Sequence, residues 1–194
     1  MRRTLVKLST KGKDMVAAME EADMEETVDG IFRQLHADWC REIEERRNTR
    51  IVPFAPCYQS VFCELNEAWI TAHWQMEETD DHALNHPGEH ILEKGGYIMV
   101  ALYREKPVGV CALIRPGESA DECELSKLAV GIGKLLCEAV IDRARELGMK
   151  TVFLESKTVL APPIRLYRTL GFREVKDFCP TYGRANIRME LPIS

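Results

Sequence analysis

A strand that runs directly into a glycine pair and then into a helix is the feature that most restricts the fold of this chain. Residues 123–130 form a predicted strand that ends at Gly131-Ile132-Gly133. Residues 134–147 then place apolar side chains at helical spacing, and Gly148 is suited to cap the helix. Because a buried strand follows at residues 151–155, this order predicts a helix packed on a sheet that contains both strands.

The glycines at the start of this helix admit two interpretations. A glycine-rich turn that opens a helix presents unpaired backbone N–H groups, and the positive end of the helix dipole, to an anion such as a pyrophosphate. A tight strand-to-helix turn also explains Gly131 and Gly133. Taken alone, the pair favours the tight turn.

The elements on either side of this unit predict an α+β domain. The predicted strands are residues 97–102 and 108–114, joined by a polar turn at 104–107, and residues 187–191. The predicted helices are residues 58–74, a shorter segment before Gly95, and residues 162–170, which end at Gly171-Phe172.

Residues 1–48 form a separate unit in this interpretation. Residues 1–13 carry five positive charges and no acid, with a short strand at residues 5–8. Two amphipathic helices follow, to about Met24 and over residues 26–47, and their apolar stripes must be buried on something other than a sheet. Asn48-Thr49-Arg50 ends the helical pattern, so we expect domains at residues 1–48 and 49–194.

Composition excludes several classes of protein. The 26 Lys and Arg against 31 Asp and Glu give a net charge of -5, which argues against a surface built throughout for nucleic acid. No apolar run is long enough to span a bilayer and the first residues do not resemble a secretory signal, so we expect a cytoplasmic protein.

The seven cysteines lack metal-ligand spacing, and we expect them to be reduced and mostly buried. His82, His86 and His90 recur every four residues, but Asn85-His86-Pro87-Gly88 breaks the helix between them, which favours a solvated loop over a zinc site.

Residues 51–192 resemble the GNAT superfamily of acyl-CoA-dependent N-acetyltransferases. The matching segments are the strand at 124–130, the Gly131-Ile132-Gly133-Lys134-Leu135-Leu136 turn, the Leu166–Phe172 ending with Leu170-Gly171-Phe172, and, for a bacterial subgroup, residues 154–157 and 182–189. Their joint order is more specific than any one of them. The resemblance implies a mixed, mostly antiparallel central sheet flanked by helices, with acetyl-CoA as the cofactor.

The resemblance also implies the residues of the site. Glu124 is the candidate base and Tyr167 the candidate acid toward the CoA sulfur; the alternatives are a salt-bridged strand carboxylate and a buried ring that only packs. The cofactor-binding candidates are Leu128, Ala129, Val130, Gly131, Ile132, Gly133, Lys134 and Leu135. Tyr182 and Arg184 are the candidates for contact with the acceptor amine, although Arg184 can equally pair with a carboxylate of the chain.

One departure from the family pattern concerns the phosphate loop. The family places about seven residues, including a Gln or Arg and another glycine, between the strand and the Gly-x-Gly, whereas Gly131 follows Val130 directly here. A βα connection is usually ~2–6 residues long. We therefore expect that a loop is missing from the printed sequence; if Val130 and Gly131 are bonded, the deletion is real and half of the phosphate loop is absent.

The first 13 residues, with the two helices after them, resemble the wing and the following helices of MarR-type regulators, written here Arg2-Arg3-Thr4-Leu5-Val6-Lys7-Leu8-Ser9-Thr10-Lys11-Gly12. Such helices form dimers in that family, so the resemblance implies a homodimer through residues 1–48. No recognition helix precedes this segment in the printed sequence, so we do not expect DNA binding by this chain.

Two classes of function follow. The first is an N-acetyltransferase that transfers an acetyl group from acetyl-CoA to a primary amine by direct attack. The second is a non-catalytic regulatory module that senses acyl-CoA or a metabolite. Substitution of Glu124 and Tyr167 separates the two, because an enzyme loses turnover while keeping its affinity for CoA and a sensor is unaffected.

Overall fold

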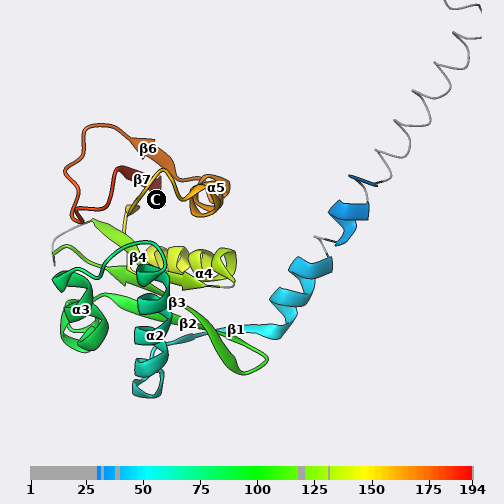
Figure 1. The fold of residues 1–194 in the computed structure, drawn as a ribbon, viewed down its shortest axis with the longest axis horizontal. Coiled ribbons are helices and arrows are strands. Elements are labelled where there is room, and N and C mark those ends of the chain that lie inside the picture. The colour runs from blue at the N-terminus through cyan, green and yellow to red at the C-terminus, as the bar shows by residue number, and fades with distance from the viewer. Residues whose placement is uncertain (1–29, 32, 38–39, 118–120, 131, 194) are drawn as a thin grey trace, which may run out of the picture. The chain divides into compact units, whose positions relative to one another are not determined.

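The computed structural model describes residues 30–31, 33–37, 40–117, 121–130 and 132–193 (Figure 1). The chain divides before Asn48 into two units. In the first unit, residues 30–31, 33–37 and 40–47 are helical, which agrees with the predicted second helix where the two overlap. The predicted strand at 5–8, the first helix and the MarR-like segment lie outside the described residues.

The second unit is built on one seven-stranded sheet. Its strands are β1 Thr49–Pro53, β2 Tyr97–Tyr103, β3 Lys106–Ile114, β4 Glu122–Val130, β5 Thr151–Ser156, β6 Arg173–Val175 and β7 Ile187–Pro192. The order across the sheet is β1-β2-β3-β4-β5-β7-β6. Every neighbouring pair is antiparallel except β4 and β5, which are parallel. This confirms the predicted mixed, mostly antiparallel sheet.

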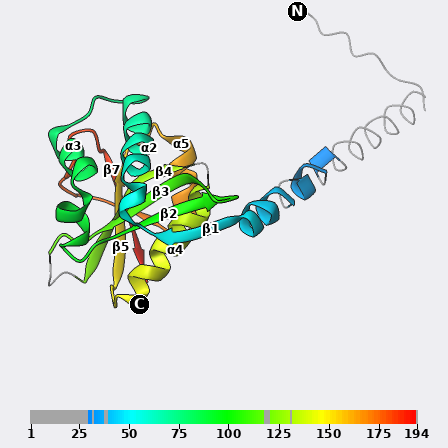
Figure 2. The ribbon, with the colours of Figure 1, turned by 90° about the horizontal axis from the view of Figure 1, so that it is seen from below.

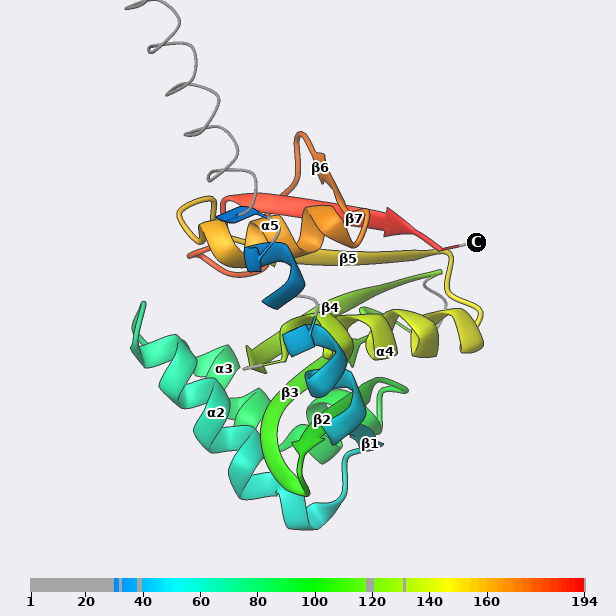
Figure 3. The ribbon, with the colours of Figure 1, turned by 90° about the vertical axis from the view of Figure 1, so that its right-hand side faces the viewer.

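Helices cover both faces of the sheet (Figures 2 and 3). The helices are α2 Gln59–Thr71, α3 Glu78–Asn85, α4 Gly133–Glu146 and α5 Ala161–Thr169, with short turns η1 Pro56–Tyr58 and η2 Gly88–Leu92. One core joins α4 and α5 to the sheet through buried residues such as Leu136, Val140 and Ile164. The other joins α2 and α3 to the opposite face through Phe62 and Leu84. The expected break in the helix after residue 85 is confirmed, because α3 ends at Asn85.

The β2–β3 hairpin is tighter than predicted. Its turn consists of Arg104 and Glu105, both with positive φ (47° and 63°), the conformation of a two-residue type I′ turn. Lys106 and Pro107, which were predicted to lie in the turn, belong to β3. The turn twists in the same sense as the strands, so a short connection suffices.

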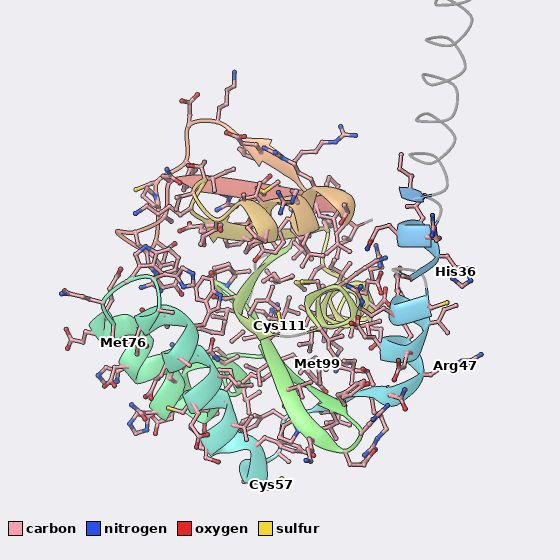
Figure 4. All side chains as sticks on the ribbon, turned by 45° about the vertical axis from the view of Figure 1, so that its right-hand side comes forward. His36, Arg47, Cys57, Met76, Met99 and Cys111 are labelled. Carbon is pink, nitrogen blue, oxygen red and sulfur yellow. The ribbon has the colours of Figure 1, made fainter. Side chains whose placement is uncertain are left out.

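The prediction that the cysteines are mostly buried is wrong. All seven are free thiols, but only Cys111, Cys123 and Cys137 are buried. Figure 4 shows Cys111 inside the domain near α4 and Cys57 at its surface. The buried three lie on β3, β4 and α4, where a small apolar side chain fits between helix and sheet.

The residue before β2 must be glycine. A Cβ atom on Gly96 would lie 2.5 Å from the backbone oxygen of Leu113 and 2.7 Å from that of Ile91. Because both obstacles are backbone atoms, Gly96→Ala is expected to lower the free energy of unfolding by about 3 kcal/mol, measured by urea denaturation. Gly88→Ala, where a Cβ meets nothing within 4 Å, is the matched control and is expected to leave stability nearly unchanged. Equal stability of the two variants would contradict this packing argument.

Candidate active site

A cavity opens where β4 and β5 separate. The two strands pair only from Glu122 with Thr151 to Glu124 with Phe153, and beyond that point they diverge (Figure 3). The cavity has a volume of about 470 Å³. Its walls come from β4, the end of β5, α5, the C-terminal end of α2 and the loop before β7: Asn66, Trp69, Ile70, His73, Trp74, Glu124, Leu125, Ser126, Lys127, Leu128, Gly133, Glu155, Ser156, Lys157, Leu160, Pro162, Pro163, Leu166, Tyr167, Tyr182, Arg184 and Ala185.

A bulge in β4 shapes one wall of this cavity. The pairing with β3 passes from Ala112 with Ser126 to Val110 with Ala129, and Lys127 has a φ of 51°. Before the bulge, Leu125 packs into the core beneath α4 and α5; after it, Leu128 packs there and Ala129 faces the core beneath α2 and α3. The alternation of the strand is therefore reversed between Leu125 and Leu128.

Glu124 is a buried carboxyl group in the wall of the cavity. Its residue is 8% exposed. Burial, and to a lesser extent the nearby Glu155 carboxylate, raise the pKa of Glu124, while a hydrogen bond with Ser126 and the charges of Lys127 and Arg188 lower it. The net effect is a pKa of about 7. Glu155 itself accepts hydrogen bonds from the backbone and hydroxyl of Thr181, at 2.8 and 3.1 Å. Glu124 is thus a group that can exchange a proton near neutral pH.

Tyr167 reaches the same cavity from α5. Two prolines at the start of that helix, Pro162 and Pro163, fix its first turn and line the cavity themselves. The ring of Tyr167 makes an edge contact with Phe172, with centroids 6.0 Å apart. Burial raises the pKa of Tyr167 above its usual value, so the phenol carries its proton and can act as a donor. The structure therefore brings both catalytic candidates to one cavity.

Tyr182 and Arg184 also line the cavity, and Arg184 is engaged by carboxylates of α3. Its guanidinium donates to both oxygens of Asp80, at 2.5 and 2.9 Å, and to Glu77 at 3.1 Å. Lys127 Nζ donates to the same Asp80 at 2.6 Å. Arg184 therefore pairs with carboxylates of the chain, as one interpretation predicted, and its contact with the acceptor amine stays a prediction.

Sequence analysis did not identify Lys127, which lines the cavity, or Asp80 and Glu77, whose carboxylates pair with the cations of its wall. The one signal was the spacing Glu77-Glu78-Thr79-Asp80, in which the side chains of Glu77 and Asp80 form a capping box at the start of α3. That pattern predicts a helix start and says nothing of a partner on β4. The bulge of β4 places Lys127 in the cavity wall, and no pattern in the sequence predicted that bulge.

The predicted cofactor-binding residues are only partly at the cavity. Leu128 and Gly133 line it, whereas Ala129 and Ile132 are buried, Leu135 is half-buried and Lys134 is exposed. The backbone of Val130 ends β4; its side chain, and all of Gly131, lie outside the described residues. The full sequence has no residue between Val130 and Gly131, so the expected missing loop is wrong and the short connection belongs to the chain.

An aromatic group forms the wall at the end of α2. Trp69, His73 and Trp74 lie with ring centroids 5.2–5.3 Å apart.

In the described part of the second unit, His82 packs its ring 6.1 Å from His86 and 5.4 Å from His90. Among the described residues, no group of three or more metal-ligating side chains is placed to hold an ion. Likewise, no helix in the described ranges is long and apolar enough to cross a membrane.

Comparison with known proteins identifies the family. The sequence model of the Acetyltransferase (GNAT) family matches residues 58–172, more than half of the 194 residues. The chain belongs to this family. The match includes α2, β4, α4, β5 and α5, which form most of the cavity wall, and ends before the loop that carries Tyr182 and Arg184.

Relatives and solved structures agree with this GNAT assignment. The ribosomal protein bS18 alanine N-acetyltransferase of Escherichia coli K12 is 38% identical over 86 residues, which are 38% of this chain and 58% of that enzyme. The chain thus matches less than two thirds of its length. A GNAT-family acetyltransferase from Staphylococcus aureus superposes with a TM-score of 0.67 at 21% identity, over 75% of this chain and 99% of that one. The yncA protein of Salmonella typhimurium, solved with its cofactor acetyl-CoA, superposes with a TM-score of 0.59 at 17% identity, over 76% and 95%.

Proposed function

We propose that this GNAT protein transfers an acetyl group from acetyl-CoA to a primary amine by direct attack of the amine. The observation that carries the proposal is the meeting of Glu124 and Tyr167, a carboxyl with a pKa near 7 and a protonated phenol, in the cavity between β4 and β5. The family and its named N-acetyltransferase relatives support the same reaction.

Glu124 acts as the base in this proposal. An alkylamine has a pKa of about 10.4 and arrives protonated, so a group of the site must take its proton before nitrogen can attack. A carboxylate whose pKa lies near 7 is matched to this transfer at neutral pH. The side chain of Ser126, hydrogen-bonded to Glu124, helps to orient the carboxylate.

Tyr167 acts as the acid. Its phenol keeps its proton because burial raises its pKa, and it can donate that proton or a hydrogen bond to the sulfur that leaves. A backbone N–H of Leu128 or Val130, at the separated end of β4, is the candidate donor to the thioester carbonyl.

The residues present fit one end of acetyl-CoA. The cofactor supplies an acetyl group as an activated thioester. The diverging end of β4 and the apolar side chains of Leu128, Leu160 and Leu166 suit the pantetheine arm, since they line the cavity that contains Glu124 and Tyr167. At the phosphate end, Gly133 begins α4 at the cavity, and the connection from β4 is only Gly131 and Ile132.

The pH dependence of turnover tests this assignment. Because Glu124 must lose its proton to act as a base, kcat/KM for an amine found by screening is expected to rise with pH through about 7 and to level off above it. The measurement is the rate of thiol release from acetyl-CoA over a range of about pH 5.5 to 8.5, which spans the pKa of about 7 on both sides. A rate that is constant across this range would contradict Glu124 as the base.

The second function, a sensor of acyl-CoA without turnover, is favoured by the missing half of the phosphate loop. It predicts that acetyl-CoA binds but releases no thiol with any member of a broad panel of primary amines. Release of CoA that depends on the amine and on Glu124 excludes it.

We also propose that the first unit joins two chains into a dimer. In support, the helical residues Ile31 and Leu35 are 54% and 59% exposed. Changing both to Glu in the full chain is expected to convert a dimer into a monomer in light scattering, whereas Gln34→Glu is not. A wild-type chain that is monomeric at micromolar concentration would overturn the dimer.

A further inference from the structure

The α3 carboxylate that pairs with two cations of the cavity wall is fully enclosed. Asp80 is 0% exposed, and its two oxygens accept three hydrogen bonds, one from Lys127 and two from Arg184. Burial alone would raise the pKa of Asp80, but the bonds from Arg184 and Lys127 lower it to about 2, so it remains charged. An ion pair in this setting is costly unless each charge is matched, and here Asp80 matches two cations with help from Glu77.

These three residues connect separate parts of the site. Lys127 lies on the bulge of β4, Arg184 lies in the loop before β7, and Asp80 lies on α3. The ring of Tyr182 packs against both cations: its centroid lies 5.2 Å from Lys127 Nζ and 5.0 Å from the guanidinium carbon of Arg184. No backbone pairing joins α3 to β4, so this cluster is a direct contact between the helix and the strand that carries Glu124.

The bulge puts Lys127 and Glu124 in the same cavity. On a regular strand, residues three apart point to opposite faces. The left-handed φ of Lys127 reverses the alternation, and both side chains line the cavity. A lysine in that place adds a positive charge beside the base, and Asp80 is the carboxylate that compensates it.

We propose that Asp80 is a positioning residue for acetyl transfer, which holds Lys127 and Arg184 so that the bulge of β4 and the Tyr182 loop keep their shape and the charge of Lys127 stays compensated beside Glu124. This inference rests on the proposed function of Glu124 as the base. It adds α3 to the machinery of the site, as a helix that acts through β4 without touching the reacting atoms.

The charged or titratable groups that act on the titration of Glu124 are Lys127 on β4, Glu155 on β5, Arg188 on β7 and Tyr182 in the loop before β7. His73 after α2, Lys157 after β5 and Arg184 before β7 line the same cavity, and Asp80 on α3 acts through Lys127, with which it pairs. Asp80→Asn removes a negative charge and frees Lys127, and both changes favour the ionised form of Glu124. Lys127→Met removes a cation and favours the protonated form.

The test measures Glu124 directly and through catalysis. The titration of its side-chain carboxyl is followed by carbon-13 NMR in the full chain, and the acid limb of the pH–rate profile is followed in parallel. Asp80→Asn is expected to move both downward by roughly half a pH unit to one unit, and Lys127→Met to move both upward by a similar amount. Asp121→Asn is the matched control, because it removes an aspartate that pairs with Lys150 at the exposed surface, and it is expected to shift neither.

Shifts of the Glu124 titration in opposite directions in the two variants distinguish a positioning role from a merely structural one. A residue with a merely structural role would lower activity without moving the titration in this way. Unchanged titration in both variants, or shifts of the same sign, overturn the inference. If Asp80→Asn alone does not fold, the same change is made in Lys127→Met, where no lysine is left without its carboxylate. The titration of Glu124 is then expected to lie below that of Lys127→Met, and an equal titration in the two variants overturns the inference. If the NMR shifts appear as expected but the wild-type chain transfers no acetyl group, the proposed function fails while the influence of Asp80 and Lys127 on Glu124 stands, and the positioning role in transfer is overturned.

Discussion

Replacing Glu124 with Gln is expected to lower kcat for amine acetylation by about 10²- to 10⁴-fold, the usual contribution of a positioned general base. The amide occupies nearly the same volume but cannot take a proton from the amine. Because Glu124 is only one of the many residues that line the cavity, its replacement is expected to change the affinity for acetyl-CoA little. Steady-state rates from thiol release and a calorimetric titration measure the two quantities.

The matched control for this change is Glu174→Gln. Glu174 lies on β6, is exposed and is absent from the cavity walls, so the same chemical change there is expected to leave kcat unaltered. The acid limb near pH 7 should also disappear from the profile of Glu124→Gln, since the group that titrates there is gone. A variant that keeps more than a tenth of the wild-type kcat would rule out Glu124 as the base.

Tyr167→Phe is expected to reduce kcat by about 10²-fold, the lower end of the range for a general acid. The change removes only the hydroxyl, and the edge contact of the ring with Phe172 remains. The loss should therefore appear in turnover rather than in folding, and the midpoint of thermal unfolding is expected to stay close to that of the wild type.

A second tyrosine provides the comparison for this variant. Tyr58, half-buried at the start of α2, does not line the cavity, so Tyr58→Phe is expected to retain full activity. If Tyr167→Phe retained it too, the phenol would only pack in the core. If its kcat fell while the Kd for acetyl-CoA stayed the same, the hydroxyl would act on the leaving group.

The elements that could be predicted from the sequence are those with strong local signals. The helix α4 and the strands β2 to β5 have clear apolar patterns and glycine stops, and each appears within a few residues of its predicted bounds. The strands β1 and β6 were not predicted. One is a five-residue edge strand that ends at a proline and the other has three residues, so each owes its conformation to its neighbour in the sheet.

The site was predictable where its residues belong to a family motif. Glu124 and Tyr167 are far apart in the sequence, yet the fold places both at the cavity between β4 and β5. Asp80 and Lys127 were missed because their significance depends on a contact between α3 and a bulge, and neither a helix cap nor a lysine in a strand indicates such a contact. The expectation of a further loop between β4 and α4 was also wrong, since Gly131 follows Val130 directly in the full sequence.

That short connection makes cofactor binding the point on which the account depends. A calorimetric titration of the full chain with acetyl-CoA tests it most directly. The account predicts one site per chain with a Kd in the micromolar range, corresponding to about -8 kcal/mol, because the cavity between β4 and β5 holds the thioester end. Absence of heat at millimolar acetyl-CoA would contradict it, and the chain would then be a GNAT fold that has lost its cofactor together with half of its phosphate loop.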